Sequence, residues 1–189
     1  MGARAGERSP GQGTLLTIST TDVSDTALHP SRRPLLVFAQ RPDASVDIDA
    51  WNAHGARFFG VRVGLAEAPG DPAPRHAAVR FVVAPAGIAP GIREATARPR
   101  LDDDLARARA AEAAHPAASA GLASLAARCP TLWLVTRHED GDDPLAWALA
   151  IVISSTLLGP ILDDERGRLV GAKTARAIVE ALGAAKPRA

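Results

Sequence analysis

Apolar and polar residues alternate along two stretches of the first half of the chain. In residues 57–65 and again in residues 79–83, apolar side chains occupy every second position. This period of two is typical of a strand that buries one face. The proline-rich segment between the stretches can only be a loop, so the pattern predicts an antiparallel pair whose Arg62 and Arg80 share the exposed face.

Two further apolar runs, residues 14–19 and 34–39, are short and rich in residues that favour strands. Residues 45–55 are ambiguous because their apolar positions alternate, while Ser45 is a good helix cap; we favour a short helix ending near Gly55. Residues 85–99 contain three prolines and two glycines. They are interpreted as a long connection, either a hinge or a surface excursion.

Helical patterns dominate after Leu101. Residues 101–114 begin with three aspartates, which favour the positive end of a helix, and residues 117–128 continue as a second helix after Pro116. Residues 131–136 predict a strand, and Pro144 begins an apolar helix of about fourteen residues that Gly159-Pro160 ends.

The chain closes with a predicted hairpin and a last helix. Short apolar runs at 161–162 and 168–170 flank an acidic turn. Ala175, Ile178 and Leu182 then follow helical spacing, and Gly183 is the expected stop.

These elements predict an α+β fold with a mixed, mostly antiparallel sheet of about five or six strands and helices mainly on one face. A three-layer α/β fold is the alternative, because the second half alternates strand and helix. We expect one domain over residues 14–183, with a disordered leader at 1–13 and a flexible tail at 184–189.

Composition removes the most obvious function class. Arginine and alanine are abundant, as in proteins encoded by GC-rich bacterial genomes, but 22 basic residues face 21 acidic ones. The net charge of +1 supplies no field that would attract polyanions, so nucleic-acid binding is not expected.

A single cysteine, Cys129, excludes an intrachain disulfide framework and favours a reducing compartment. Residues 1–13 lack the apolar core of a secretory signal. The apolar helix from Pro144 is about 21 Å long at 1.5 Å per residue, too short to cross a bilayer of about 30 Å. We therefore expect a cytoplasmic protein without a membrane partner.

The acidic turn at residues 138–143 is the best candidate for chemistry. Asp140, Asp142 and Asp143 surround a glycine after a predicted buried strand, and carboxylates are the ligands that Mg²⁺ and Ca²⁺ prefer. His138 can act as a base beside Asp140. The competing interpretation is structural, with Asp142 or Asp143 capping the next helix.

The other motifs are weaker candidates for a functional site than the acidic turn. The acidic cluster at 163–165 suits a hairpin turn, and the intervening helix is expected to hold it at the opposite end from residues 138–143. Residues 171–174 lack the glycine spacing of a phosphate-binding loop, and a strand separates Cys129 from His138. Large side chains are scarce, so we expect four aromatic residues to anchor the core: Trp133, Trp147, Phe59 and Phe81.

The sequence thus predicts no cofactor, apart from a divalent metal at the acidic turn. The favoured hypothesis is a non-enzymatic protein that acts by contact with another protein or with itself, as an adapter, regulator or inhibitor-like partner. The alternative is a metal-assisted hydrolase or transferase that uses residues 138–143.

Overall fold

The computed structural model describes residues 33–42, 45–66, 78–138 and 143–185. Contacts divide the chain into residues 1–30 and a unit spanning Ser31–Ala189, and every described element belongs to the second unit. The predicted leader at 1–13, the predicted strand at 14–19 and the end of the predicted tail at 186–189 lie outside the described residues.

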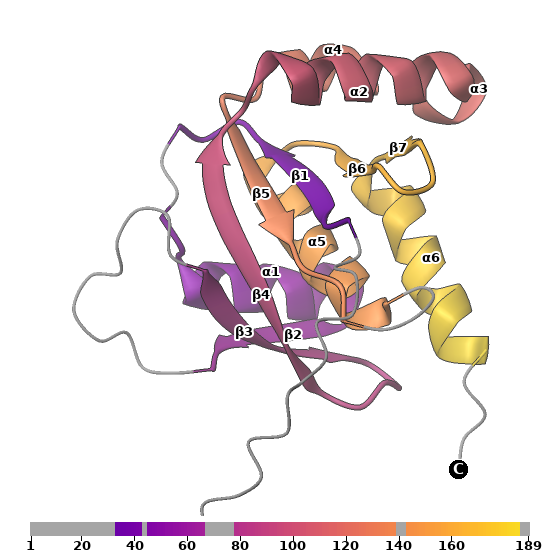
Figure 1. Ribbon diagram of the computed structural model, residues 1–189. Coiled ribbons are helices and arrows are strands. Elements are labelled where there is room, and N and C mark those ends of the chain that lie inside the picture. The colour runs from indigo at the N-terminus through magenta and orange to yellow at the C-terminus, as the bar shows by residue number, and fades with distance from the viewer. Residues whose placement is uncertain (1–32, 43–44, 67–77, 139–142, 186–189) are drawn as a thin grey trace, which may run out of the picture. The chain divides into compact units, whose positions relative to one another are not determined.

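The described strands form one antiparallel sheet in the order β2-β3-β4-β5-β1-β6-β7 (Figure 1). This confirms the α+β class, and every strand pairing in the sheet is antiparallel. The sequence-predicted pair is also present, because β2 pairs with β3 and both Arg62 and Arg80 are exposed, but residues 57–59, expected in its first strand, end a helix instead. The strands are β1 Leu35–Ala39, β2 Val61–Leu65, β3 Val79–Pro85, β4 Gly91–Pro99, β5 Thr131–Val135, β6 Ile161–Asp163 and β7 Arg168–Val170.

Strand β4 corrects the interpretation of residues 85–99 as a connection. It is nine residues long and joins β3 to β5 in the middle of the sheet. Pro99 stands at its last position and Pro90 just before its first, so these prolines remove no donor from the interior of the strand. Residues 86–90 are a tight turn, and no hinge is present between β3 and β4.

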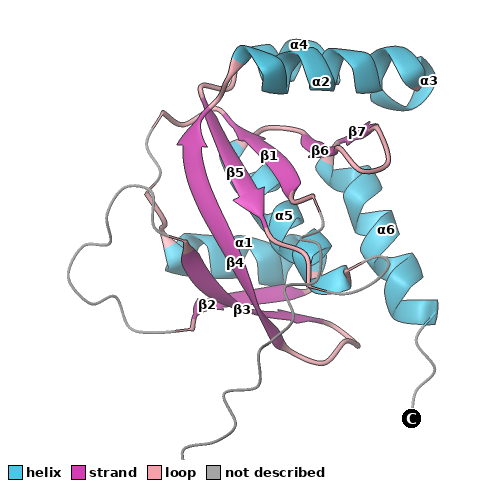
Figure 2. Cartoon of the chain, in the orientation of Figure 1, coloured by secondary structure: helices cyan, strands magenta, loops and turns pink. Residues whose placement is uncertain are grey.

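Three of the described helices cover each face of the sheet, and one group is larger because its helices are longer (Figure 2). The larger group is α1 Ile48–Phe59, α5 Pro144–Leu157 and α6 Ala172–Ala185. The smaller group is α2 Asp102–Ala114, α3 Pro116–Ser119 and α4 Leu122–Ala127, of which α3 and α4 replace the single helix expected at 117–128. Helices α2 and α4 pack on residues of β1, β5, β6 and β7.

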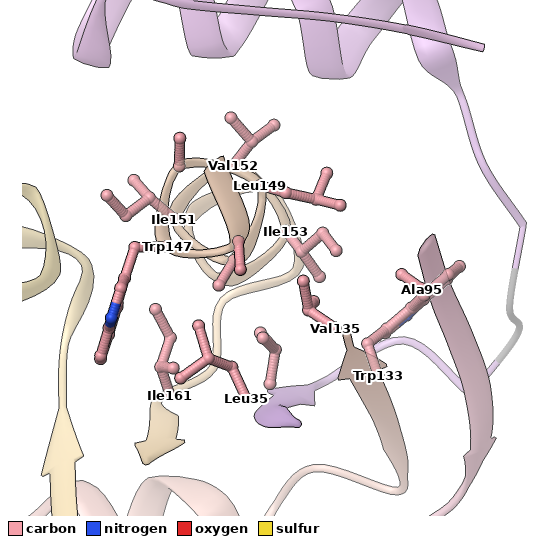
Figure 3. Close-up of a cluster of buried hydrophobic side chains, with 14 of the residues drawn as sticks. Leu35, Ala95, Trp133, Val135, Trp147, Leu149, Ile151, Val152, Ile153 and Ile161 are labelled. Carbon is pink, nitrogen blue, oxygen red and sulfur yellow. The ribbon is translucent and has the colours of Figure 1, made fainter. Parts of the chain in front are cut away.

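The main core surrounds α5, which is buried on almost all sides as its uniformly apolar sequence predicts (Figure 3). Trp133 and Trp147 are buried anchors, as expected, and so is Phe81. Trp51 joins them: its ring stacks on Phe81 at 5.8 Å and meets the edge of Trp133 at 5.6 Å. Such offset and edge contacts add about 0.5–1.5 kcal/mol per pair beyond area burial.

One expected anchor and two expected helix ends differ from the structure. Phe59 is only partly buried at the end of α1. Helix α1 continues past Gly55 because this glycine lies against β2, where a Cβ atom would approach the Val61 carbonyl oxygen to 2.5 Å. Helix α6 likewise continues through Gly183, which the sequence interpretation had placed at its end.

Helix α1 also covers the edge of the sheet at β2. The side-chain oxygen of Asn52 accepts the backbone N–H of Val63 at 3.1 Å. Strand β2 therefore has its outward side occupied by a helix of the same chain. Among the described helices, none has the length and apolarity that a bilayer crossing requires.

Candidate functional site

The acidic turn joins β5 to α5, as its sequence position predicts, but its members have different environments. His138 is exposed after β5, whereas Asp143 is fully buried at the N-terminus of α5. Asp140 and Asp142 lie outside the described residues. Of the four predicted site residues, the structure therefore places two, and it links them through the backbone N–H of His138, which donates to Asp143 at 3.1 Å.

Both carboxylate oxygens of Asp143 are engaged. Oδ1 accepts the backbone N–H groups of Leu145 and Ala146, which makes Asp143 the N-cap of α5. Arg93 on β4 donates two further bonds, from Nε at 2.7 Å and from a terminal nitrogen at 2.8 Å. The capping role is thus combined with a buried, bidentate ion pair.

Burial by itself raises the pKa of Asp143, but the bonds from Arg93, Ala146 and His138 lower it further than burial raises it. The net pKa lies below the ordinary value of 3.8, so the carboxylate is ionised at neutral pH. Its charge is already balanced by a guanidinium, and a metal ion at Asp143 would face that cation at close range. The geometry explains Asp143 as a structural residue.

A second buried cluster lies beside the start of the acidic turn. Arg137 donates to Asp163 and to Glu165, and Arg168 donates to the other oxygen of Asp163 at 2.9 Å. The expectation that residues 138–143 and 163–165 lie at opposite ends of α5 is therefore wrong. Arg137, immediately before the first segment, contacts Asp163 and Glu165 in the second. Strand β6 returns the chain along β1, and the long Arg137 side chain spans the remaining gap.

Asp163 and Asp104 follow the same electrostatic rule as Asp143. Burial raises the pKa of each carboxyl, but paired arginines lower it to a net value below 3.8. For Asp104, at the start of α2, the partners include Arg98, and the backbone N–H of Leu101 donates to it as well. The three buried aspartates are thus fixed anions that hold helices and the hairpin to the sheet.

Cys129 has no features of a nucleophile. Its thiol is buried under α4 and donates to the Leu125 carbonyl oxygen at 3.3 Å. Burial raises its pKa to about 11, because neighbouring Arg100 and Arg128 lower it less than burial raises it. A thiol with that pKa is almost entirely protonated at neutral pH and reacts slowly.

No group of three or more potential metal ligands occurs within the described part of the chain. The metal hypothesis, which needs Asp140 and Asp142, stays a prediction. The sequence interpretation missed Arg93 and Arg137, the two arginines that organise this end of the sheet. Ala95 and Ala97, at alternate positions after Arg93, were the available signal that residues 91–99 form a strand with one buried face.

A second candidate surface lies on β2, β3 and the first half of β4, on the face of the sheet that points away from α1, α5 and α6. We call this surface the open face, because within the described residues the helices α2 and α4 pack farther along the sheet. At its centre Val82 pairs with Ile92, and both are exposed, at 37% and 40%. Its side chains are those of Arg62, Arg80, Val82, Ala84, Ile92, Glu94 and Thr96, with Gly64 opposite Val82.

Charged residues surround the apolar centre of the open face. Arg80 approaches Glu94 on the neighbouring strand at 3.7 Å, and Arg62 lies on the other side of Val82.

Comparison of the chain with known protein families, with curated proteins and with solved structures finds no match.

Proposed function

We propose that this protein is non-enzymatic and acts in the cytoplasm by protein contact, as an adapter, regulator or inhibitor-like partner, with the open face as its contact surface. The observation that supports this proposal is the exposed cross-strand pair of Val82 and Ile92. An apolar centre inside a polar rim is the ordinary anatomy of a protein interface.

The charges around this centre favour a second copy of the same chain as the partner. In the register of the sheet, Arg62 lies opposite Ala84, beyond Val82 in one direction, and Glu94 lies opposite Arg80, beyond it in the other. A two-fold axis that passes near Val82 in the plane of this face, and crosses the line from Arg62 to Glu94 at about a right angle, brings Arg62 of each copy toward Glu94 of the other. Such a surface is self-complementary, as an isologous dimer requires.

Sedimentation velocity over a range of protein concentrations tests this proposal. The wild-type chain is expected to shift from monomer to dimer as concentration rises. Ile92→Lys places a charge at the apolar centre and should weaken the dimer about tenfold or more, since central interface residues carry most of the binding energy. Leu158→Lys is the matched control, because Leu158 is also exposed, at 62%, but lies at the end of α5.

A charge exchange separates the proposed geometry from unspecific association. Arg62→Glu and Glu94→Arg should each weaken the dimer, and the double variant should restore it in part, because the proposed contacts are then re-formed with reversed polarity. A wild-type chain that remains monomeric throughout, or an Ile92→Lys variant that dimerises like the wild type, overturns self-association through this face.

The alternative, a metal-assisted hydrolase or transferase, has no observation in its favour among the described residues. Its test is thermal melting with Mg²⁺, Mn²⁺ or Ca²⁺, since a ligand that binds only the folded state raises the melting temperature. We expect no shift, because Asp143 is held by Arg93. A clear shift that Asp140→Asn abolishes would restore the metal hypothesis.

A further inference from the structure

A surface groove lies where the helices α1, α5 and α6 meet the turn between β3 and β4. It is formed by the end of α1, the turn between β3 and β4, the first residues of α5 and the last turns of α6. The β3–β4 turn and the C-terminal end of α6 both lie in the lower right part of Figure 1, and residues of both line the groove. The groove has a volume of about 1390 Å³ and shares no residue with the open face.

Apolar side chains line the interior of this groove. They come from all four elements and belong to Phe59, Ile88, Leu145 and Val179. Gly183 lets α6 approach the β3–β4 turn closely, because a Cβ atom at this position would lie 3.3 Å from Cδ1 of Ile88. A large side chain at residue 183 would therefore displace Ile88 and occupy part of the groove.

An arginine and an aromatic ring stand together at the rim. Phe58 is 49% exposed, which is unusual for a chain with so few large side chains. The guanidinium carbon of Arg57 lies 5.1 Å from the centre of this ring. Aromatic residues and arginine are the side chains most enriched at energetically dominant positions of protein interfaces.

The rim carries more positive than negative charge. Arg57 and Arg176 line the groove together with one carboxylate, that of Glu180. Arg176 donates to Glu180 at 2.7 Å and to the Phe58 carbonyl oxygen at 3.1 Å. Arg57 has no carboxylate partner among the described residues. A bound group that brings a carboxylate to Arg57 would complete the charge balance.

The size of the groove favours a peptide over a small molecule. Pockets for small ligands have volumes of about 300–1,000 Å³ and enclose most of the ligand. This groove is larger and partly open to solvent. A segment of polypeptide can fill such a groove with one apolar side chain and extend along the rim.

We propose that the groove binds a segment of a partner protein that carries a large apolar anchor residue next to aspartate or glutamate. The anchor lies between Ile88, Leu145 and Val179, and the acidic residue pairs with Arg57. This site is independent of the open face, so a failure of the proposed self-association leaves it untouched.

Selection from a phage-displayed library of random peptides tests the proposal, with the full chain as bait. Enriched peptides are expected to combine an aromatic or leucine residue with a neighbouring acidic one. One enriched peptide is then synthesised with a fluorescent label, and its affinity is measured by anisotropy. Gly183→Trp fills the groove and should weaken binding about tenfold or more. The matched control is Ala181→Trp, an exposed position of the same helix outside the groove.

Charge reversal supplies the second measurement. Arg57→Glu should weaken the labelled peptide, whereas Lys173→Glu, which changes the net charge equally at an exposed position outside the groove, should not. The proposal is overturned if no peptide is enriched, if the enriched peptides are basic, or if they bind Gly183→Trp as tightly as the wild type. Circular dichroism of each variant confirms that a loss of binding is not a loss of folding.

Discussion

Neighbouring residues of β3 differ in exposure, because they lie on opposite faces of the sheet. Val82 and Val83 are adjacent and identical, yet Val82 is 37% exposed on the open face, while Val83 is completely buried under the larger helical layer. The difference is imposed by the alternation of the strand and by where the helices pack. One face of β3 therefore belongs to the core, and the other is exposed among the described residues.

Ion pairs occur on both faces of the sheet, but they are buried on one face and exposed on the other. Arg93 is buried and is paired with Asp143 beneath the start of α5. Arg80, two strand positions from Val82, keeps its pair with Glu94 at the surface. Buried pairs fix helices in place, whereas exposed pairs contribute little to stability and can be exchanged for contacts with another molecule.

Acid is expected to have the largest effect, because it acts on all three buried aspartates at once. Their folded pKa values lie below 3.8, so the unfolded chain binds more protons as the pH falls past that value. Their contribution to stability is complete above pH 3.8 and is lost below it. Urea unfolding midpoints measured from neutral to strongly acidic pH should be flat and then fall; midpoints that stay constant in acid would contradict the role of these pairs.

Trp133→Ala tests the buried face at its centre. Trp133 is in edge contact with Trp51 and lies against α5. Truncation of a buried aromatic residue leaves a cavity and should lower the free energy of unfolding by about 3–5 kcal/mol. Urea unfolding followed by circular dichroism measures this loss. A loss below about 1 kcal/mol would show that the core is not packed as described.

Arg93→Met tests the buried ion pair. The variant keeps an apolar stem but leaves the Asp143 carboxylate without its counter-charge, and removal of one partner of a buried pair costs about 3 kcal/mol or more. Addition of Asp143→Ser should recover part of this loss, since serine still caps α5 and carries no charge. Asp143→Ser alone completes the cycle: if it changes stability by the same amount in the wild type as in the Arg93→Met variant, the pair contributes no coupling energy.

Val83→Thr and Val82→Thr compare the two faces most directly. The substitutions are the same and nearly isosteric, so only the environment differs. A hydroxyl at the buried position 83 should cost about 1–3 kcal/mol if it finds no hydrogen-bond partner. The same hydroxyl at the exposed position 82 should change stability by no more than about 0.5 kcal/mol. Similar losses at both positions would show that the open face is covered.

Alternation and apolar runs were sufficient to predict β1, β3, β5 and the buried helix α5. Each is governed by local pattern, since apolar residues at a period of two, or on all sides of a helix, leave few alternatives. Strand β4 shows only a weak alternation, because its buried positions are Arg93, Ala95 and Ala97 rather than large apolar residues. Its position depends on the strands that flank it.

The candidate site shows the same limit. Asp143 could be predicted as a helix cap because capping is a local property of the turn. Its pairing with Arg93 joins residues fifty positions apart, and no local pattern encodes that contact. Gly55 was misread for a related reason: its close approach to β2 is a tertiary requirement, which overrides the tendency of glycine to end a helix.

The capping of β2 by α1 has a consequence for how the chain avoids aggregation. An uncovered sheet edge offers unpaired backbone groups to any extended chain, and fibrils grow by this kind of addition. Here Asn52 occupies the Val63 N–H, and Gly55 lets the helix lie directly over the Val61 carbonyl. Because α1 and β2 are consecutive, this protection requires only a local contact and can form early, while β3 and β4 are still being synthesised.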